Sequence, residues 1–195
     1  EKLNFYHNLG YLHLNISPYN IIVEENTLNV SFINFVLPHN LVSTDNKYLS
    51  PEHISTNLKA DFRSDYYSAG ICIYEFITGK HPFDGIEFND YKKLHLFLKI
   101  DDSKHINPNT PEILSIIIAK LIEKKPKNRY QNALSIKYDL QKVIDLKTPQ
   151  QIKSFRPGSM DHINNPLCSN IEGQYPQIAD EISKIIEDCR NEKIY

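Results

Sequence analysis

The sequence predicts a mainly α domain of the α+β class, with several helices around one buried helix and a small hairpin at one edge. Residues 65–78 are apolar on nearly every side, which is typical of a helix that is buried all round. Residues 112–124 and 132–146 carry apolar side chains at helical spacing, so each should pack one face against that helix. Residues 28–33 alternate between apolar and polar side chains, as a strand does.

The first part of the chain is expected to hold the end of a helix and the hairpin. Residues 3–9 are predicted to be helical, with Gly10 as the stop. Short extended segments are predicted at 11–16 and 21–23, on either side of a Ser-Pro turn. The segment 21–23 should then pair with the strand at 28–33 across a polar turn.

The middle of the chain is expected to alternate between loop and helix. Residues 38–46 are polar and aperiodic, which indicates a surface loop. Gly79 should end the buried helix, and Pro126 should close the helix at 112–124. The helix at 132–146 has its apolar stripe on Ala133, Ile136, Leu140 and either Val143 or Ile144.

The composition changes after residue 146, so the domain is predicted to span 1–146. Residues 147–176 contain several prolines and indicate a linker or an extended packing segment. Residues 177–195 predict an amphipathic helix. It could dock on the same body, begin a following module or form a short coiled-coil interface. Its stripe consists of Ile178, Ile182, Ile185, Ile186 and Cys189.

The composition excludes several classes of protein. Of the 195 residues, 41% are hydrophobic and 24% are charged, which is typical of a globular domain and not of a disordered chain. The net charge of −2 gives no reason to expect nucleic acid or a membrane as a partner. Cys72, Cys168 and Cys189 are widely separated and odd in number, so they predict no disulfide framework and favour a reducing, cytoplasmic location.

Three short strings stand in the order and approximate spacing of protein-kinase motifs. H-L-N-I-S-P-Y-N at residues 13–20 resembles H-R-D-L-x-x-x-N, N-F-V at 34–36 resembles D-F-G, and S-P-E at 50–52 resembles A-P-E. Further on, D-Y-Y-S-A-G at 65–70 resembles D-x-W-S-x-G, and T-G-K-H-P-F at 78–83 resembles T-G-x-x-P-F. The chain therefore resembles the C-terminal lobe of a protein kinase, of the serine/threonine type.

The resemblance also implies what the chain lacks. No stretch resembles the glycine-rich loop or the V-A-I-K lysine of the N-terminal lobe, so that lobe is expected to be absent from this chain. The chain is then a piece of a longer protein or a truncated product. The sequence of residues 48–83 is similar to that of the kinase-like domains of large multidomain sensor histidine kinases.

Three departures lie in the segment that corresponds to the catalytic loop. Asn15 stands where the resemblance implies the aspartate that orients the substrate hydroxyl, and an amide is no base at neutral pH. The loss of a positioned base costs about 10²- to 10⁴-fold in rate. Ser17 replaces the lysine that neutralises the transferring phosphate, and Leu14 replaces the arginine that holds a phosphorylated activation loop.

Two further positions concern nucleotide and metal binding. Asn20 matches the family's metal-binding asparagine, although an asparagine is equally suited to holding a loop. Asn34 replaces the aspartate that holds magnesium, and a neutral amide is a poorer ligand for that hard cation. Val36 replaces a glycine and should fix the loop in one arrangement. Asn20 and Asn34 are therefore predicted to bind metal and nucleotide weakly at best.

Four residues that support the fold in the family are retained. His13 is expected to pack beneath the catalytic loop, and Asp65 should accept backbone N–H groups from that loop. Glu52 and Arg129 should form the ion pair that the resemblance implies.

The pattern as a whole predicts a pseudokinase fragment with a regulatory or scaffolding role in intracellular signalling. The alternative is a part of an ATP-binding protein kinase or sensor-kinase protein with weak phosphotransferase activity. The chain itself is expected to hold no cofactor, and ATP with Mg²⁺ is expected only in a longer parent protein. The expected partner is another protein or the missing N-terminal lobe. The face of this chain that would contact that lobe should be apolar.

Overall fold

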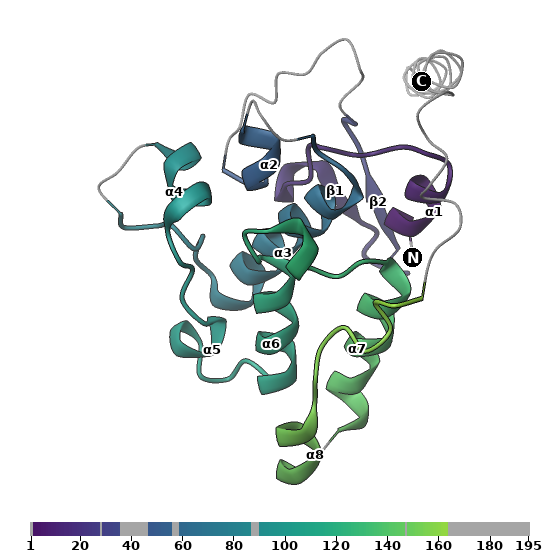
Figure 1. Ribbon diagram of the computed structural model, residues 1–195, viewed down its shortest axis with the longest axis vertical. Coiled ribbons are helices and arrows are strands. Elements are labelled where there is room, and N and C mark those ends of the chain that lie inside the picture. The colour runs from purple at the N-terminus through teal and green to yellow at the C-terminus, as the bar shows by residue number, and fades with distance from the viewer. Residues whose placement is uncertain are drawn as a thin grey trace.

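The structure, a computed structural model, describes residues 2–27, 29–35, 47–55, 59–86, 90–146 and 148–163. Figure 1 shows mostly helices and one two-stranded sheet, so the predicted mainly α (α+β) class is confirmed. The elements are α1 (Lys2–Asn8), η1 (Pro18–Asn20), β1 (Ile21–Val23), β2 (Val30–Phe32), α2 (Pro51–Ile54), α3 (Phe62–Thr78), α4 (Tyr91–Phe97), α5 (Ser103–Ile106), α6 (Glu112–Leu121), η2 (Pro126–Asn128), α7 (Ala133–Asp145) and α8 (Pro149–Ser154).

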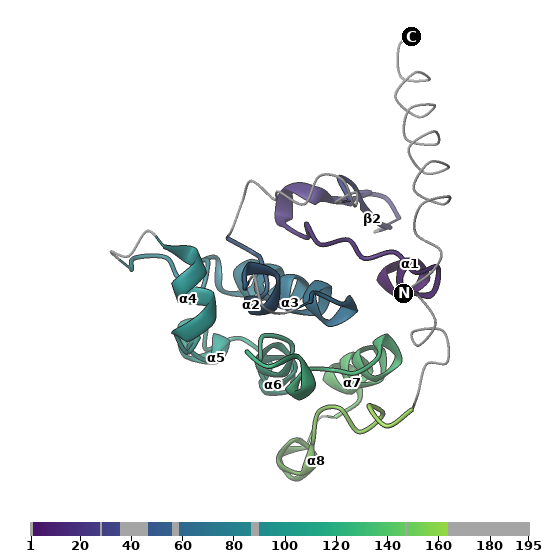
Figure 2. The ribbon, with the colours of Figure 1, turned by 45° about the horizontal axis from the view of Figure 1, so that its top comes forward.

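Helix α3 lies in the middle of a layered arrangement. Figure 2 shows the hairpin and η1 on one side of α2 and α3, and α6 and α7 on the other side. Two hydrophobic clusters follow from this position. One joins Tyr67 and Ile71 of α3 to Ile16 of the loop that precedes η1, and the other joins Tyr66 to Ile117 of α6. The predicted buried central helix is therefore confirmed.

Local hydrogen bonds determine where α3 begins and ends. The Asp61 carboxylate accepts from the N–H of Arg63 at 2.8 Å, and the Ser64 hydroxyl accepts from the N–H of Asp61 at 3.2 Å. This cap starts the helix at Phe62, three residues before the predicted start at 65. Gly79 ends it in the left-handed conformation, with φ of 71°. The prediction of burial all round fails in the last turn, where Phe76 is 61% exposed.

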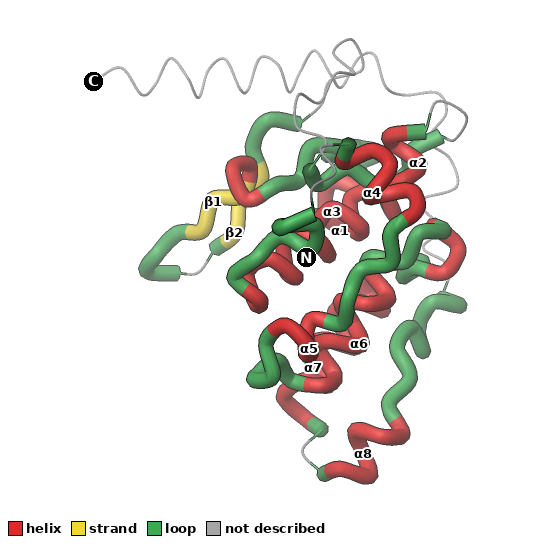
Figure 3. Tube along the Cα trace, turned by 90° about the vertical axis from the view of Figure 1, so that its left-hand side faces the viewer, coloured by secondary structure: helices red, strands yellow, loops and turns green. Residues whose placement is uncertain are grey.

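The hairpin lies at one end of the helical body and is shown in yellow in Figure 3. Its strands are antiparallel, and Ile22 pairs with Ser31. The second strand is shorter than the predicted 28–33. Residues 11–16 belong to no strand, and the predicted extended backbone is interrupted at Leu14, whose φ is 55°. Helix α1 and the glycine that stops it agree with the prediction. The expected surface loop at 38–46 lies outside the described residues.

Most of the predicted apolar stripe of helix α7 packs inwards, with Val143 and not Ile144 as its last member. Leu140 was also expected to pack inwards, but it is 39% exposed. The reason is that the buried carboxylate of Asp139 faces inwards, where it accepts from the Tyr130 hydroxyl at 2.8 Å and from the N–H of Gly158 at 2.6 Å. The core face of α7 is therefore set by this polar contact as well as by Ala133, Ile136 and Val143.

The segment after residue 146 contains α8, which the sequence pattern did not indicate. Thr148 and Gln151 form a capping box at its start. Beyond it, Phe155 is 8% exposed and belongs to the second hydrophobic cluster. Asp161 forms an ion pair with Lys120 at 3.0 Å. Residues 148–163 thus pack against α6 and α7, while the predicted domain limits at 146 and 176 stay predictions, and the predicted helix at 177–195 lies outside the described residues.

Helices α4 and α5 were also not predicted. Each is short, and each begins at an aspartate, Asp90 or Asp102, whose side chain accepts a backbone N–H. Conversely, α6 ends at Leu121 instead of continuing to 124. None of the helices in the described ranges has the length and apolar composition needed to cross a membrane.

Candidate functional site

The loop at residues 13–20 is held in place by the first turn of α3. Asp65 is fully buried, and its carboxylate accepts from the N–H of His13 at 2.8 Å and from the N–H of Leu14 at 2.7 Å. Leu14 has a positive φ of 55°, a conformation that is unfavourable for a side chain of this kind. The two hydrogen bonds to one carboxylate hold the backbone in that conformation. This is the contact that the resemblance implied for Asp65.

Three asparagines form a closed hydrogen-bond network, here called the asparagine network: Asn15, Asn20 and Asn34. The Asn20 side-chain amide donates to the backbone carbonyl of Asn15 at 2.7 Å. The Asn34 amide donates to Asn20 Oδ1 at 2.9 Å. The Asn15 amide donates to the backbone carbonyl of Asn34 at 3.0 Å. The structure therefore brings together the three positions that the sequence singled out for catalysis and metal binding.

The local backbone explains why these residues meet. The N–H of Ile33, just after β2, donates to the carbonyl of Asn20 at 3.1 Å and places Asn34 beside it. Asn34 has φ of 59°, in the left-handed region that asparagine tolerates better than most residues. Val36, which was expected to fix this loop, lies outside the described residues.

The network determines which way each amide points. A backbone carbonyl can only accept, so the Asn20 atom that faces the Asn15 carbonyl must be Nδ2. Oδ1 of Asn20 then faces Asn34 and needs a donor, which the Asn34 amide supplies. With an aspartate at position 34, two acceptor oxygens would meet at about the same distance, and a proton or a cation would be needed between them. The Asn34 amide does what a cation would otherwise do at this point.

The charge of the site is low. Ser17, at the position of the expected lysine, is 6% exposed and carries no charge. Residues 13–20 contain neither lysine nor arginine. No group of three or more histidine, cysteine, aspartate or glutamate side chains that could hold a metal ion occurs within the described ranges.

His13 lies beneath this loop among aromatic rings. Its ring centroid is 4.2 Å from that of Phe35 and 5.6 Å from that of Phe32. Its Nδ1 accepts from the N–H of Asn15 at 3.2 Å, which requires that nitrogen to be unprotonated. Burial lowers the pKa of His13, although the charge of Asp65 acts in the opposite direction. A neutral, packed imidazole agrees with the structural role expected for His13.

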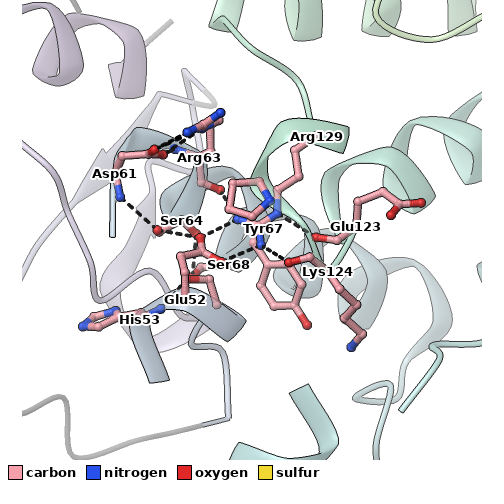
Figure 4. A network of polar contacts seen from close by, with 12 residues as sticks. Glu52, His53, Asp61, Arg63, Ser64, Tyr67, Ser68, Glu123, Lys124 and Arg129 are labelled. Atoms are coloured by element: carbon pink, nitrogen blue, oxygen red, sulfur yellow. Dashed lines mark hydrogen bonds and ion pairs between the residues drawn. The ribbon is translucent and has the colours of Figure 1, made fainter. Parts of the chain in front are cut away.

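A second polar network, here called the arginine network, centres on Glu52 and Arg129 (Figure 4). The two side chains pair through two hydrogen bonds, of 2.6 Å and 2.7 Å, and are 2% and 0% exposed. The Ser64 hydroxyl donates to the same carboxylate at 2.7 Å. Burial acts to raise the pKa of Glu52, but the hydrogen bonds and charge of Arg129 outweigh it, so the pKa lies below its usual value.

All five N–H groups of Arg129 have acceptors. Besides the two bonds to Glu52, the guanidinium donates to the backbone carbonyls of Arg63, Glu123 and Lys124, at 2.8, 2.7 and 3.1 Å. Its carbon lies 4.8 Å from the centre of the Tyr67 ring. Arg129 thereby joins α2, α3 and the turn after α6 in the buried interior.

The structure adds histidines that the sequence analysis did not single out. His7 Nε2 lies 2.8 Å from the Asp65 carboxylate. His81 and His95 each approach the carbonyl of Lys47 through Nε2, at 3.0 Å and 2.7 Å. These contacts join residues 34 to 58 positions apart, so no local pattern could have indicated them.

The geometry described above agrees with the comparisons with known proteins. The family model described as "Protein kinase domain" matches residues 1–139. The chain belongs to the protein kinase domain family. Its relatives include probable serine/threonine-protein kinases of Clostridium acetobutylicum, 36% identical over 152 residues, and Clostridium perfringens, 37% identical over the same length. Each alignment covers 73% of this chain, and 23% and 22% of the respective relatives.

The relatives also include a further serine/threonine-protein kinase and a histidine kinase. The serine/threonine-protein kinase PknB of Mycolicibacterium smegmatis is 32% identical, over 78% of this chain and 26% of its own length. Hybrid signal transduction histidine kinase G of Dictyostelium discoideum is 30% identical, over 75% of this chain and 5% of its own length. The chain thus spans about a quarter or less of the relatives it matches.

Proposed function

We propose that this chain is the C-terminal lobe of a protein-kinase-like domain that works by binding a partner and not by phosphoryl transfer. In this role it would regulate or scaffold a larger signalling protein in the cytoplasm. The observation that carries the proposal is the closed asparagine network. Each of its side chains is neutral, and each has its amide N–H directed at an oxygen of the network.

The first argument concerns the proton that a kinase must remove. The Asn15 amide donates to a backbone carbonyl, so at this point it acts as a donor where a base would accept. The amide has no basicity at neutral pH. Ser17 supplies no positive charge for a transferring phosphoryl group.

The second argument concerns Mg²⁺ with ATP, which the family implies. Asn20 Oδ1 already accepts from Asn34, and Asn34 brings an amide where an anionic oxygen would be needed. One unit charge at about 4 Å is worth about 4 kcal/mol at an effective dielectric of 20. The residues present therefore do not fit a tightly held divalent cation.

A third argument comes from the surface. Large apolar side chains of α1, of the residue that follows it, of η1 and of β1 are well exposed, and a partner that covers them would remove them from water. A second lobe in a longer parent protein, or a separate protein, is the partner we propose for these side chains. These side chains are Phe5, Leu9, Tyr19, Ile22 and Val23, each at least 50% exposed.

The second candidate function is weak nucleotide binding or phosphotransfer in a longer parent protein. Two observations favour it: Asn20 is retained, and several relatives are named as serine/threonine-protein kinases. The relative named as a hybrid histidine kinase favours a sensor-kinase parent.

Radiometric phosphotransfer on the intact parent protein separates the two. We expect no transfer above background from the native protein. The double variant Asn15→Asp with Asn34→Asp tests whether restored carboxylates bring activity back. Strong activity of the native protein would contradict the first proposal.

Calorimetry of ATP binding adds a test of the metal argument. ATP uptake by the native parent should not depend on Mg²⁺, whereas the Asn34→Asp variant should bind better when Mg²⁺ is present. Asn26→Asp, which adds the same charge in the hairpin turn, is the matched control and should behave as the native protein does. Micromolar, magnesium-dependent binding by the native protein would contradict the proposal.

A further inference from the structure

A cavity of about 530 Å³ is lined by residues of α3, α5 and α6 and by the end of α4. Its floor is apolar and consists of Ile118 and Ala119 of α6 together with Ile122. Phe97, at the end of α4, is 80% exposed and lines the rim. This volume is in the range of pockets that bind ligands and side chains of partners. All of its lining residues are described, and none belongs to the asparagine network.

Two polar groups at the cavity have no partner of their own. Tyr74 is 2% exposed, yet its hydroxyl forms no hydrogen bond with the described residues. The carboxylate of Asp101, also in the lining, forms no hydrogen bond or ion pair with them either. Burial and the charges of Asp101 and Asp102 raise the pKa of Tyr74, so its hydroxyl remains a donor. Both groups are open to water, and a bound ligand that hydrogen-bonds to them would take the place of that water.

The charges around the cavity favour a cation. Lys99 and Lys124 line it as well, but the ammonium group of Lys124 lies against the rings of Tyr67 and Phe83, at 5.9 and 5.6 Å from their centres. Those two rings do not line the cavity, so the Lys124 ammonium points toward them and not toward the other lining charges. The other ionisable side chains of the lining are those of Asp101, Asp102, Glu123, Lys99 and His105.

Asp102 remains ionised although it is already engaged. Its carboxylate accepts from the N–H of Lys104 at 2.8 Å and from the hydroxyl of Ser115. Burial acts to raise its pKa, but the hydrogen bond from Ser115 and the contact with Lys104 outweigh it, so the pKa is lowered. Three carboxylates against two lysines, Lys99 and Lys124, give the cavity an acidic wall beside an apolar floor.

We propose that this cavity binds a partner polypeptide through one apolar side chain next to an arginine or lysine. The apolar side chain would lie on Ile118, Ala119 and Ile122, with Phe97 covering it. The cationic side chain would pair with Asp101, and the Tyr74 hydroxyl would donate to a carbonyl of the partner. Binding at this cavity would not require the chain to transfer phosphate. It would give a chain that works by binding, the function proposed above, a partner of stated chemistry.

A peptide with one tryptophan between two arginines is a direct probe. The chain contains no tryptophan, so the fluorescence of the peptide reports on binding without background from the protein. The peptide is titrated with the 195-residue chain at low ionic strength, where ion pairs are screened least. A second peptide carries glutamates in place of the arginines. We expect saturable binding of the first peptide and none of the second at the same concentrations.

Two variants of the chain locate the site. Ala119→Phe fills the floor from an exposed position on α6, so it should abolish binding and leave the fold intact. Asp101→Asn removes the free carboxylate and should weaken binding about fivefold, the upper range for an accessible ion pair. Glu25→Gln removes an exposed carboxylate in the hairpin turn and should bind as the native chain does. Circular dichroism of each variant verifies folding.

The outcomes decide the matter. Loss of binding with Ala119→Phe and weakening with Asp101→Asn, but not with Glu25→Gln, supports the proposal. No saturable binding of the arginine peptide, or binding that neither cavity variant changes, overturns it. Equal binding of the glutamate peptide overturns the assignment of a cationic partner.

Discussion

The asparagine network and the arginine network both join segments that are distant in the sequence, but they differ in charge and exposure. The asparagine network is neutral, and Asn34 is exposed. The arginine network contains a full ion pair whose members are 0% and 2% exposed. The first lies at the positions that carry out chemistry in the family, and the second lies where segments of the fold meet.

The difference shows which charges a fold can lose. Replacing an exposed carboxylate by an amide alters one hydrogen bond and leaves no buried charge behind. Removing either Glu52 or Arg129 would leave the other charged and buried, which costs about 3–5 kcal/mol. A chain under selection for folding alone would therefore retain the ion pair, even where the residues for chemistry are absent.

The largest expected effect is on the arginine network. Arg129→Met should lower the free energy of unfolding by about 3–5 kcal/mol, because Glu52 and three backbone carbonyls lose their donor. Urea denaturation followed by circular dichroism measures this. Lys104→Met, which removes an ion pair with Glu112 at the surface, is the control and should cost less than about 1 kcal/mol. A similar loss of unfolding free energy in the two variants would mean that the buried ion pair is worth no more than the exposed one.

A smaller effect is expected from an apolar contact outside the family match. Phe155→Ala should cost about 3 kcal/mol, because its ring lies in the cluster with Tyr66 and Tyr130. The same denaturation experiment compares it with Ile163→Ala, whose side chain is 36% exposed and should matter much less. If Phe155→Ala cost as little as that control, residues 148–163 would contribute little to the free energy of unfolding.

Adding a charge to the asparagine network should lower the free energy of unfolding less than removing a charge from the arginine network does. Asn34→Asp places an acceptor opposite Asn20 Oδ1 and should cost about 0.5–1.5 kcal/mol without added cations, because Asn34 is exposed. Millimolar Mg²⁺ should recover part of that loss, measured as a rise in the denaturation midpoint. Asn26→Asp should show neither the loss nor the recovery. A variant that is as stable as the native chain in the absence of Mg²⁺ would show that the amide of Asn34 is not needed.

The smallest expected effect is on the pH dependence of stability, which should differ between His13, beneath the loop at 13–20, and Glu52 of the arginine network. Burial lowers the pKa of His13, so its stabilising contribution is present above the unfolded value of 6.5 and is lost as the pH falls below it. The pKa of Glu52 is also lowered, and its contribution is present above 4.5 and is lost only at more acidic pH. The stability difference between the native chain and His13→Gln should therefore shrink as the pH falls below 6.5.

Denaturation at several pH values measures this difference. His105→Gln, at an exposed position, should follow the curve of the native chain. A difference between the native chain and His13→Gln that stays constant from pH 7 to pH 5 would contradict the assignment of His13 as a buried neutral group.

The sequence predicted the features whose cause is local or carried by a motif. The apolar character of residues 65–78 identified α3, and Gly79 its end. The motif order indicated the positions of Asn15, Asn20 and Asn34, but not that their amides close on one another. That closure depends on the Ile33 N–H bonding to the Asn20 carbonyl, a contact no pattern reports.

Other features were missed because tertiary contacts outweighed the pattern. The predicted stripe on α7 included Leu140, which is 39% exposed, because the neighbouring Asp139 carboxylate is the group that faces the interior. Helices α4 and α5 are too short for a period to be recognised. The short α8 was hidden in a segment whose prolines indicated a linker, although one of them, Pro149, is its first residue.

The buried Asp139 has a practical consequence for expression of this protein. The family match ends at that residue, within α7, and its carboxylate serves both Tyr130 and Gly158. A recombinant fragment cut at the family boundary would lose the second half of a helix, and Phe155 would no longer fill its place in the interior. Cloning through Ile163 keeps these partners on one polypeptide.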